Sequence, residues 1–468
     1  MPSSPATPAW RIRLLRVIYR SLWWLVAPGA VIRLLWRSRQ EAGYRRHIGE
    51  RFGFGGAPIG GAPVGDAPDE GRRLDGAPSS RRSPQRRPLI WVHAVSVGET
   101  RGAQPLIDAL LAACPHAQLL ITHMTPGGRA ASLSLFGDRV SRAYLPYDMR
   151  GPVRRFLRRY QPQVGVVMET EVWPTLIDEC ERAGVPLVLA NARMSERSFR
   201  RAARFGAGAR AVFGGLTAVL AQTDADRQRL AALGARRVDV LGNIKFDVRI
   251  DPALVARGQR WRAAIGARPV WVAASTREGE EELVLEAFAR QLASGPTDAL
   301  LILVPRHPQR FDEVSELVAR TWRGIRRSAW HGAETDAGSL SPDIQVLIGD
   351  SMGELVAYYA AADLAFIGGS LVPTGSHNLI EAAAVGCPVL IGPHTFNFAQ
   401  ASLHAIESGA ALRVDSPAAL GDAVSALLSD AARRRTMADA AQAFAERDRG
   451  ATARTVEALA AYLAGSSR

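Results

Sequence analysis

The sequence has few cysteines, a single lysine and no familiar cofactor fingerprint. Of its 468 residues only three are cysteine, namely Cys114, Cys180 and Cys387. Their odd number and wide separation form neither a disulfide framework nor a metal-ligand spacing, which favours a reducing compartment. No convincing Gly-x-Gly-x-x-Gly motif, Walker loop or Ser/His/Asp signature is found, and the histidines are dispersed. A mechanism without metal or other cofactor therefore fits best.

The near absence of lysine makes the remaining one conspicuous. Among 58 basic residues, Lys245 is alone and all the others are arginine. A retained ammonium group indicates a site that needs a compact point charge, which a planar guanidinium does not imitate. The alternative is chance survival of one codon, which the physical difference between the two side chains makes the weaker interpretation.

The positive charge is concentrated at the N-terminal end. The net charge is +13, but residues 1–88 carry sixteen arginines against six acids, so the remainder is close to neutral. A nucleic-acid-binding domain would carry its basic residues on the folded body. Here arginines recur at helical spacing beside a short apolar stretch, residues 21–32, that is interrupted by Pro28-Gly29. We expect no nucleic acid but a monotopic helix on an anionic membrane surface, with a signal peptide or an ordinary packed helix as alternatives.

Two series of short apolar runs follow a Gly/Ala/Pro/Arg-rich stretch at residues 53–88, which we interpret as a flexible insertion. The expected strands are Leu89–Val95, Leu119–Thr122, Gly165–Met168, Leu187–Ala190, Ala218–Ala221, Val238–Leu241, Val270–Ala274, Leu300–Val304, Gln345–Ile348, Leu364–Ile367 and Val389–Ile391. Helix-length segments separate them, which predicts α/β architecture with parallel sheets. Two series predict two doubly wound domains, joined near residues 245–268, with a ligand cleft at the carboxyl ends of the strands.

Charged residues follow the expected strands of the first series. Glu99 comes after Val-His-Ala-Val-Ser-Val-Gly at a helix start, where it is either a general base or a plain helix cap; the spacing leaves both open. Glu169 and Glu171 follow the strand Gly165–Met168, Asn191 and Arg193 follow the next, and Lys245 follows the last. These polar residues either form a site or hydrogen-bond to one another and stiffen the loops.

The second series carries a different set of candidates. Pro305 and Arg306 follow one strand, and Arg306 is well placed for a phosphate. The segment Ser351-Met352-Gly353-Glu354 opens a helix, where small residues expose the backbone N–H groups that bind phosphate. In the loop-to-helix segment Asn378-Leu379-Ile380-Glu381 we expect Glu381 one turn into the helix, able to accept hydrogen bonds from ribose hydroxyls.

Taken together, these segments closely resemble the bacterial 3-deoxy-D-manno-octulosonic acid (Kdo) transferases. The segments that carry the resemblance are Trp91–Thr100, Met168–Pro174, Asn191–Ser198, Val304–Pro308, Ser351–Leu355 and Gly375–Pro393, in this order. The match extends from about residue 89 to 430. The insertion at 53–88 departs from the family pattern, as does Ser376, where a second glycine is commoner.

The resemblance implies a GT-B fold, in which two Rossmann-like domains face each other across a cleft. The implied division is an anchor and lead-in at 1–52, the insertion at 53–88, an acceptor-binding domain at 89–245 and a CMP-Kdo-binding domain at 246–468 that includes the closing helices. It also implies an inverting transfer of Kdo from CMP-Kdo to a lipid A precursor (lipid IVA) on the cytoplasmic face of the inner membrane, in lipopolysaccharide biosynthesis.

The resemblance further assigns roles to residues. Glu99 would deprotonate the acceptor hydroxyl, and Glu169 and Lys245 would stabilise the transition state. The implied CMP-binding positions are Pro305, Arg306, Met352, Gly353, Glu354, Asn378, Leu379, Ile380 and Glu381, and no metal site is implied. The rival interpretations are another GT-B enzyme, such as a UDP-sugar transferase or a sugar-nucleotide epimerase, and a non-catalytic membrane-surface binding protein.

Overall fold

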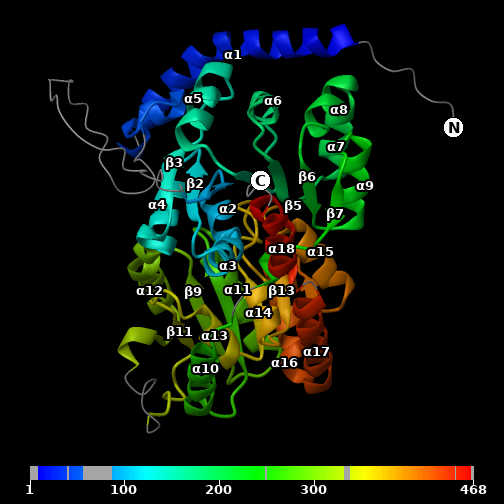
Figure 1. Ribbon diagram of the computed structural model, residues 1–468. Helices are drawn as coiled ribbons and strands as arrows, with labels where there is room; N and C mark the ends of the chain where they lie inside the picture. The colour runs from blue at the N-terminus through cyan, green and yellow to red at the C-terminus, as the bar shows by residue number, and fades with distance from the viewer. Residues whose placement is uncertain are drawn as a thin grey trace, which may run out of the picture. The chain divides into compact units, whose positions relative to one another are not determined.

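The computed structural model describes residues 9–39, 42–55, 87–247, 250–330, 338–447 and 449–464. Most of the predicted insertion therefore lies outside the described residues. The described chain divides into two compact units after Asp247, and the chain returns to the first unit at Gly450. We call them the first and the second domain, and each is described by itself (Figure 1).

The first domain is built on a parallel sheet of seven strands in the order β3-β2-β1-β4-β5-β6-β7. Its strands are β1 (Leu89–His93), β2 (Gln118–His123), β3 (Ser141–Tyr144), β4 (Val164–Met168), β5 (Leu187–Ala192), β6 (Ala218–Ala221) and β7 (Val238–Val240). Its helices are α1 (Ala9–Arg37), α2 (Val97–Gly102), α3 (Gln104–Ala113), α4 (Pro126–Phe136), α5 (Arg150–Tyr160), α6 (Pro174–Ala183), α7 (Glu196–Ala203), α8 (Ala207–Phe213), α9 (Asp224–Ala232) and α18 (Ala451–Ala464), with short 3-10 helices η1 (Ala42–Arg45), η2 (Ile48–Phe52), η3 (Gly137–Arg139) and η4 (Ile244–Phe246).

Helices cover both faces of this sheet because successive residues of each strand point to opposite sides. Trp91 of β1 joins the core beneath α5, α6 and α8, whereas its neighbours Ile90 and Val92 join the core beneath α3 and α18. Strands buried on both faces explain why the sequence reads as continuous apolar runs.

The second domain repeats this plan with the strand order β10-β11-β9-β8-β12-β13-β14, again all parallel. Its strands are β8 (Val270–Thr276), β9 (Leu300–Pro305), β10 (Gly324–Arg326), β11 (Val346–Ile348), β12 (Leu364–Ile367), β13 (Val389–Ile391) and β14 (Ala411–Arg413). Its helices are α10 (Pro252–Ile265), α11 (Glu280–Ser294), α12 (Phe311–Ala319), α13 (Leu355–Ala361), α14 (Ile380–Ala384), α15 (Ala399–Glu407), α16 (Pro417–Ser429) and α17 (Ala431–Arg447), with η5 (Pro308–Arg310) and η6 (Arg327–Ala329). Two doubly wound domains are therefore confirmed.

The boundary of the second domain was wrong at its C-terminal end. We assigned residues 246–468 to it, but the chain leaves it before Gly450 and α18 packs against α3 of the first domain. The Asp247 carboxylate fastens this return by accepting hydrogen bonds from the N–H groups of Gly450 and Thr452, at 2.6 and 2.5 Å. The last helix of the sequence, α18, thus belongs to the first domain.

Helix α1 runs without a break through Pro28 and Gly29, which interrupt the apolar stretch of the sequence but not the helix. Tyr19 Oη donates a hydrogen bond to Asp148 Oδ2 at 2.8 Å, and Arg20 pairs with Asp178 at 3.0 Å. Both partners belong to the first domain, which fixes the middle of α1 on that domain. Within α1, the window Val17–Leu34 is long and apolar enough to cross a membrane by length and composition.

Candidate active site

The strand order of the first domain places β1 and β4 side by side at the point where the chain reverses its direction of winding. Ligands of doubly wound sheets bind beyond the carboxyl ends of such a strand pair. Glu99 follows β1 and Glu169 follows β4, so the fold brings both carboxylates to this position. Lys245, after β7, joins them there through a direct ion pair with Glu169.

Glu99 lies in the first turn of α2, where Ser96 is the N-cap. Its Oε2 atom accepts a hydrogen bond at 2.8 Å from the N–H of Val95, the residue before the N-cap. The pKa of its carboxyl is nevertheless raised to about 7, chiefly by burial and further by the negative charges of Glu171 and Glu169, against the lowering effects of the Val95 N–H and Lys245. A carboxylate whose pKa lies near neutrality is suited to accept a proton from a hydroxyl group. A position in the first turn of a helix is therefore compatible with a role of Glu99 as a general base.

Glu169 is held between two cations. Its Oε1 atom lies 2.6 Å from Lys245 Nζ, and its Oε2 atom lies 3.3 Å from Arg193 Nε. The backbone of Glu169 has a φ of 60°, a conformation that costs free energy outside glycine and that often marks a functional site. The structure thus brings together Glu99, Glu169 and Lys245.

Asn191 helps to fix the backbone of η4, the short helix that contains Lys245. It also has a positive φ, 51°, and lies at an irregularity in the pairing of β5 with β6. Its Oδ1 atom accepts a hydrogen bond from the N–H of Ile244 at 3.1 Å, and Asn243 Oδ1 accepts one from the N–H of Lys245 at 3.0 Å. These contacts hold η4, which carries the lysine. The polar loop residues therefore both form the site and stiffen it.

Gly102, at the end of α2, is part of this arrangement and was missed in the sequence. A Cβ atom built on it would lie 2.9 Å from Lys245 Cε, so the lysine stem runs directly over this glycine. A side chain at residue 102 would push the ammonium away from Glu169. The only signal in the sequence is a glycine in the same short helix as Glu99.

The donor-site candidates lie in the second domain, mostly at strand ends. Pro305 ends β9, and the N–H of Arg306 donates to Thr276 O of the neighbouring strand β8 at 3.0 Å. Arg306 and Glu381 both act electrostatically on the buried Tyr359, whose pKa Glu381 raises and Arg306 lowers, beneath a dominant effect of burial. The two candidates therefore lie in one neighbourhood.

The segment Met352–Glu354 offers a ligand its backbone and an exposed methionine. Met352 is 58% exposed and Gly353 has a φ of 84°. The Glu354 carboxylate is instead occupied by ion pairs with Arg257, at 2.7 Å, and Arg327. Its side chain thus stabilises the protein, and we retain Glu354 as a binding residue only through its main chain.

The segment Asn378–Glu381 behaves similarly. The side chains of Leu379 and Ile380 are fully buried, so only their main chain is left to face a ligand. Glu381 is the second residue of α14, not one turn into it as we expected, and its Oε1 atom accepts a hydrogen bond from Asn378 Nδ2 at 3.0 Å. The Asn378 Oδ1 atom accepts a hydrogen bond at 3.0 Å from the N–H of Ile380, the first residue of α14.

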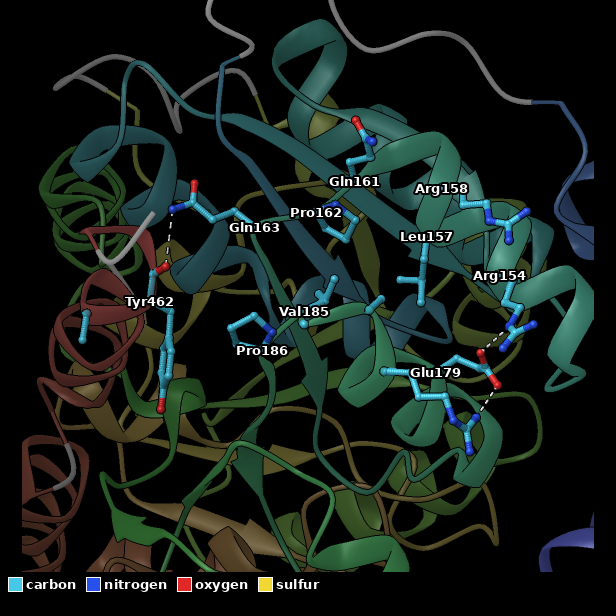
Figure 2. Close-up of a pocket in the computed structure, with 14 residues that line it drawn as sticks. Arg154, Leu157, Arg158, Gln161, Pro162, Gln163, Glu179, Val185, Pro186 and Tyr462 are labelled. Carbon is cyan, nitrogen blue, oxygen red and sulfur yellow. Dashed lines mark hydrogen bonds and ion pairs between the residues drawn. The ribbon is translucent and has the colours of Figure 1, made fainter. Parts of the chain in front are cut away.

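The first domain also has a hollow of about 830 Å³ (Figure 2). It is lined by the last turns of α5 and α6, by the segments that lead into β4 and β5, and by Tyr462 of α18. These segments mark the amino ends of the strands, opposite to the edge that carries Glu99 and Glu169. None of the predicted site residues lines it.

Comparison with known proteins agrees with the motifs. The family described as 3-Deoxy-D-manno-octulosonic-acid transferase (kdotransferase) matches residues 47–248, and Glycosyl transferases group 1 matches residues 333–444. The chain is 46% identical to a 3-deoxy-D-manno-octulosonic acid transferase of Bordetella pertussis over 382 residues, which cover 80% of this chain and 87% of the relative. It is 35% identical to that of Haemophilus influenzae over 453 residues, 96% of this chain and 99% of the relative.

A solved UDP-GlcNAc 2-epimerase of Neisseria meningitidis, bound to UDP-GlcNAc, shares the fold with a TM-score of 0.52, covering 80% of this chain and all of that one. At 14% identity this likeness concerns the fold alone. The family matches identify the chain as a glycosyltransferase, and its two doubly wound domains are those of the GT-B class. Within that class the chain belongs to the 3-deoxy-D-manno-octulosonic acid transferase family, and it transfers Kdo in lipopolysaccharide biosynthesis.

Proposed function

We propose that the enzyme is an inverting transferase that moves Kdo from CMP-Kdo to a hydroxyl group of a lipid A precursor, lipid IVA. The observation that carries this proposal is the cluster of Glu99, Glu169 and Lys245 at one sheet edge, in a chain that belongs to the Kdo transferase family. The CMP part of the donor would lie on Arg306 and the backbone segments 352–354 and 378–381 of the second domain.

In the proposed reaction the acceptor hydroxyl attacks the anomeric carbon of Kdo on the face opposite to CMP. The new C–O bond forms as the bond from the anomeric carbon to the phosphate oxygen of CMP breaks, and CMP departs as an anion. Glu99 accepts the hydroxyl proton through the carboxylate oxygen that the Val95 N–H does not occupy. Lys245, held by Glu169, offsets the negative charge of the Kdo carboxylate or of the departing phosphate.

We propose that this charge stabilisation needs no metal ion, because Lys245 and Arg193 supply positive charge at the site. Among the described residues, no three His, Cys, Asp or Glu side chains form a group that could hold a metal. Prior dialysis against EDTA should leave the transfer rate unchanged, and a loss that Mg²⁺ restores would contradict the metal-free proposal.

We also propose a monotopic position on the cytoplasmic face of the inner membrane. One side of α1 is occupied by its contacts with the first domain through Tyr19, Arg20 and Trp23. The exposed apolar side chains of α1 are Trp10, Leu14, Val17, Ile18, Leu22, Val26, Ile32 and Trp36. Since the pairs of Tyr19 and Arg20 fall inside the apolar window, the helix lies along the domain, and its exposed apolar side chains suit the membrane interface.

The reaction is tested with the purified full chain, CMP-Kdo and a tetraacylated lipid A precursor in mixed micelles, with mass spectrometry of the lipid. We expect Kdo on the lipid and an equivalent release of CMP, and no product from UDP-sugars. A folded protein that modifies no lipid and releases no CMP would overturn the proposal.

The membrane position is tested with vesicles that contain anionic phospholipid. Leu22→Glu should reduce binding to these vesicles several-fold. The matched control is Leu133→Glu, because Leu133 is similarly exposed but lies on α4. Equal binding by the two variants would show that α1 is not the membrane contact.

A further inference from the structure

The second domain has its own strand pair at the reversal of winding, formed by β8 and β12. This pair corresponds to β1 and β4, which carry Glu99 and Glu169 in the first domain. The segments that leave it are residues 277–279 after β8 and 368–371 after β12. Fold geometry makes this crevice a favoured place for a ligand, yet none of the donor-site candidates comes from residues 277–279.

Glu280, the first residue of α11, ties the two segments together. Its side chain is fully buried, and it accepts hydrogen bonds from the N–H groups of Gly369 at 2.6 Å, Ser370 at 3.0 Å, Leu371 at 2.9 Å and Arg277 at 3.1 Å. A buried carboxylate is tolerated only with such compensation. Because the Glu280 carboxylate accepts hydrogen bonds from four backbone N–H groups, one of them that of Arg277, it holds the backbone of Arg277 in place.

The chain is bent sharply just before Arg277. Ser275 has a φ of 60°, and the pairing of β8 with β9 shifts by one residue between Ala274 and Thr276. A bulge of this kind redirects the side chains that follow it. A non-glycine residue with this backbone stores strain, which persists where surrounding contacts such as the Glu280 hydrogen bonds enforce it.

The Arg277 guanidinium is half-buried and has no carboxylate partner among the described residues. Its Nη1 atom lies 2.5 Å from His307 Nε2, which acts as the acceptor when the imidazole is neutral. Its Nε atom is buried without a hydrogen-bond partner in the described part of the chain. A cation that is partly removed from water and left without a counter-ion is prepared for an anion. The neighbouring strand end carries Arg306.

We propose that Arg277 binds the phosphate of the sugar-nucleotide donor and that Glu280 is the positioning residue that holds it there. This inference rests on the proposed use of a nucleotide-activated donor. Arg277 then supplies the charge-assisted contact to phosphate, beside Arg306, while the backbone segments after β11 and β12 hold the rest of the nucleotide. The positive charge of Arg277 also favours departure of the anionic nucleotide.

Calorimetric titration with a nucleotide and with its nucleoside separates binding of the phosphate from binding of the base and ribose. Titrations of CMP against cytidine and of UDP against uridine should be made on wild type, Arg277→Gln, Arg277→Lys and Arg290→Gln. Arg290→Gln is the matched control, since it removes the same charge from the same domain at an exposed pair with Asp422. Arg277→Gln should weaken CMP about 10-fold or more and leave cytidine unchanged, and Arg277→Lys should recover part of the loss.

The other outcomes are equally decisive. Unchanged CMP affinity in Arg277→Gln, or an equal loss of CMP and cytidine, would overturn the phosphate contact. If wild type binds UDP in place of CMP, the proposed donor fails, while the UDP and uridine pair still tests Arg277; binding of neither nucleotide overturns both. Glu280→Gln should show the same selective loss of CMP. An equal loss of CMP and cytidine would assign Glu280 to folding alone.

Discussion

Substitution of Gly102 by alanine should damage catalysis without damaging the fold. The new Cβ atom would lie 2.9 Å from Lys245 Cε, whereas carbon atoms in contact are about 3.5–4.0 Å apart. The lysine stem must therefore move by roughly 0.5–1 Å, which stretches its 2.6 Å contact with Glu169. A misplacement of this size lowers kcat by about 10- to 100-fold. Alanine is also the better helix former, by up to about 1 kcal/mol, so stability should hold or rise.

The assay is the steady-state rate of Kdo transfer, with thermal unfolding measured on the same samples. Gly98→Ala is the matched control because it lies in the same helix α2, and its Cβ atom would meet only Ser96 Oγ at 3.9 Å. A double-mutant cycle with Lys245→Ala completes the test. If Gly102→Ala keeps full activity, or if it still lowers the rate when Lys245 is absent, the proposed contact between glycine and lysine is refuted.

Three further changes test other parts of the account. Glu99→Gln should make the protein more stable than wild type above pH 7, by about 2–3 kcal/mol, and no more stable below pH 4.5. The reason is that the raised pKa of Glu99, about 7, makes the wild type lose stability as the pH rises from 4.5 to 7. Equal denaturation midpoints of the two proteins at pH 8 would contradict this. Lys245→Arg should lose about 100-fold in kcat because a guanidinium does not reproduce the compact charge beside Glu169; retention of more than half the activity would make the lone lysine a survival by chance. Asp148→Ala should cost about 3 kcal/mol in urea unfolding, since Asp148 accepts the N–H groups that open α6 and the Tyr19 hydroxyl of α1; an unchanged midpoint would show that these bonds contribute little.

The apolar runs of the sequence predicted the interior strands of both sheets and one edge strand, β7, but not the other three edge strands. The three strands that were missed are β3, β10 and β14, and each lies at the edge of its sheet. They are three or four residues long and partly exposed, with sequences such as Gly-Ile-Arg. An edge strand needs only one covered side and one bonded neighbour, so its sequence carries little of the apolar signal that marks a strand buried on both faces.

The part of the site that could be predicted consists of single charged residues that follow the ends of strands. Glu99, Glu169 and Lys245 belong to this kind, and the fold brings them together. Gly102 and Glu280 were missed because their importance is a matter of contact, with a lysine stem in one case and with four backbone N–H groups in the other. Such contacts join segments far apart in the chain and leave no pattern in the local sequence.

The long-range connections also explain the unbroken course of α1 and one wrong expectation. Pro28 lies inside α1, although proline removes one helical hydrogen bond and disfavours a helix interior. Contacts of the helix with Asp148 and Asp178, more than a hundred residues away in the chain, support it. The return of α18 to the first domain likewise depends on Asp247 and on the core beneath α3.

The measurement that tests the central claim most directly is the pH dependence of Kdo transfer from CMP-Kdo to the lipid A precursor, by wild type and by Glu99→Gln. For wild type we predict a rate that rises tenfold per pH unit on the acid side and levels off near pH 7, where Glu99 becomes ionised. For folded Glu99→Gln we predict a residual rate that lacks this limb. A variant that transfers Kdo at the wild-type rate with the same pH profile would show that Glu99 is not the base.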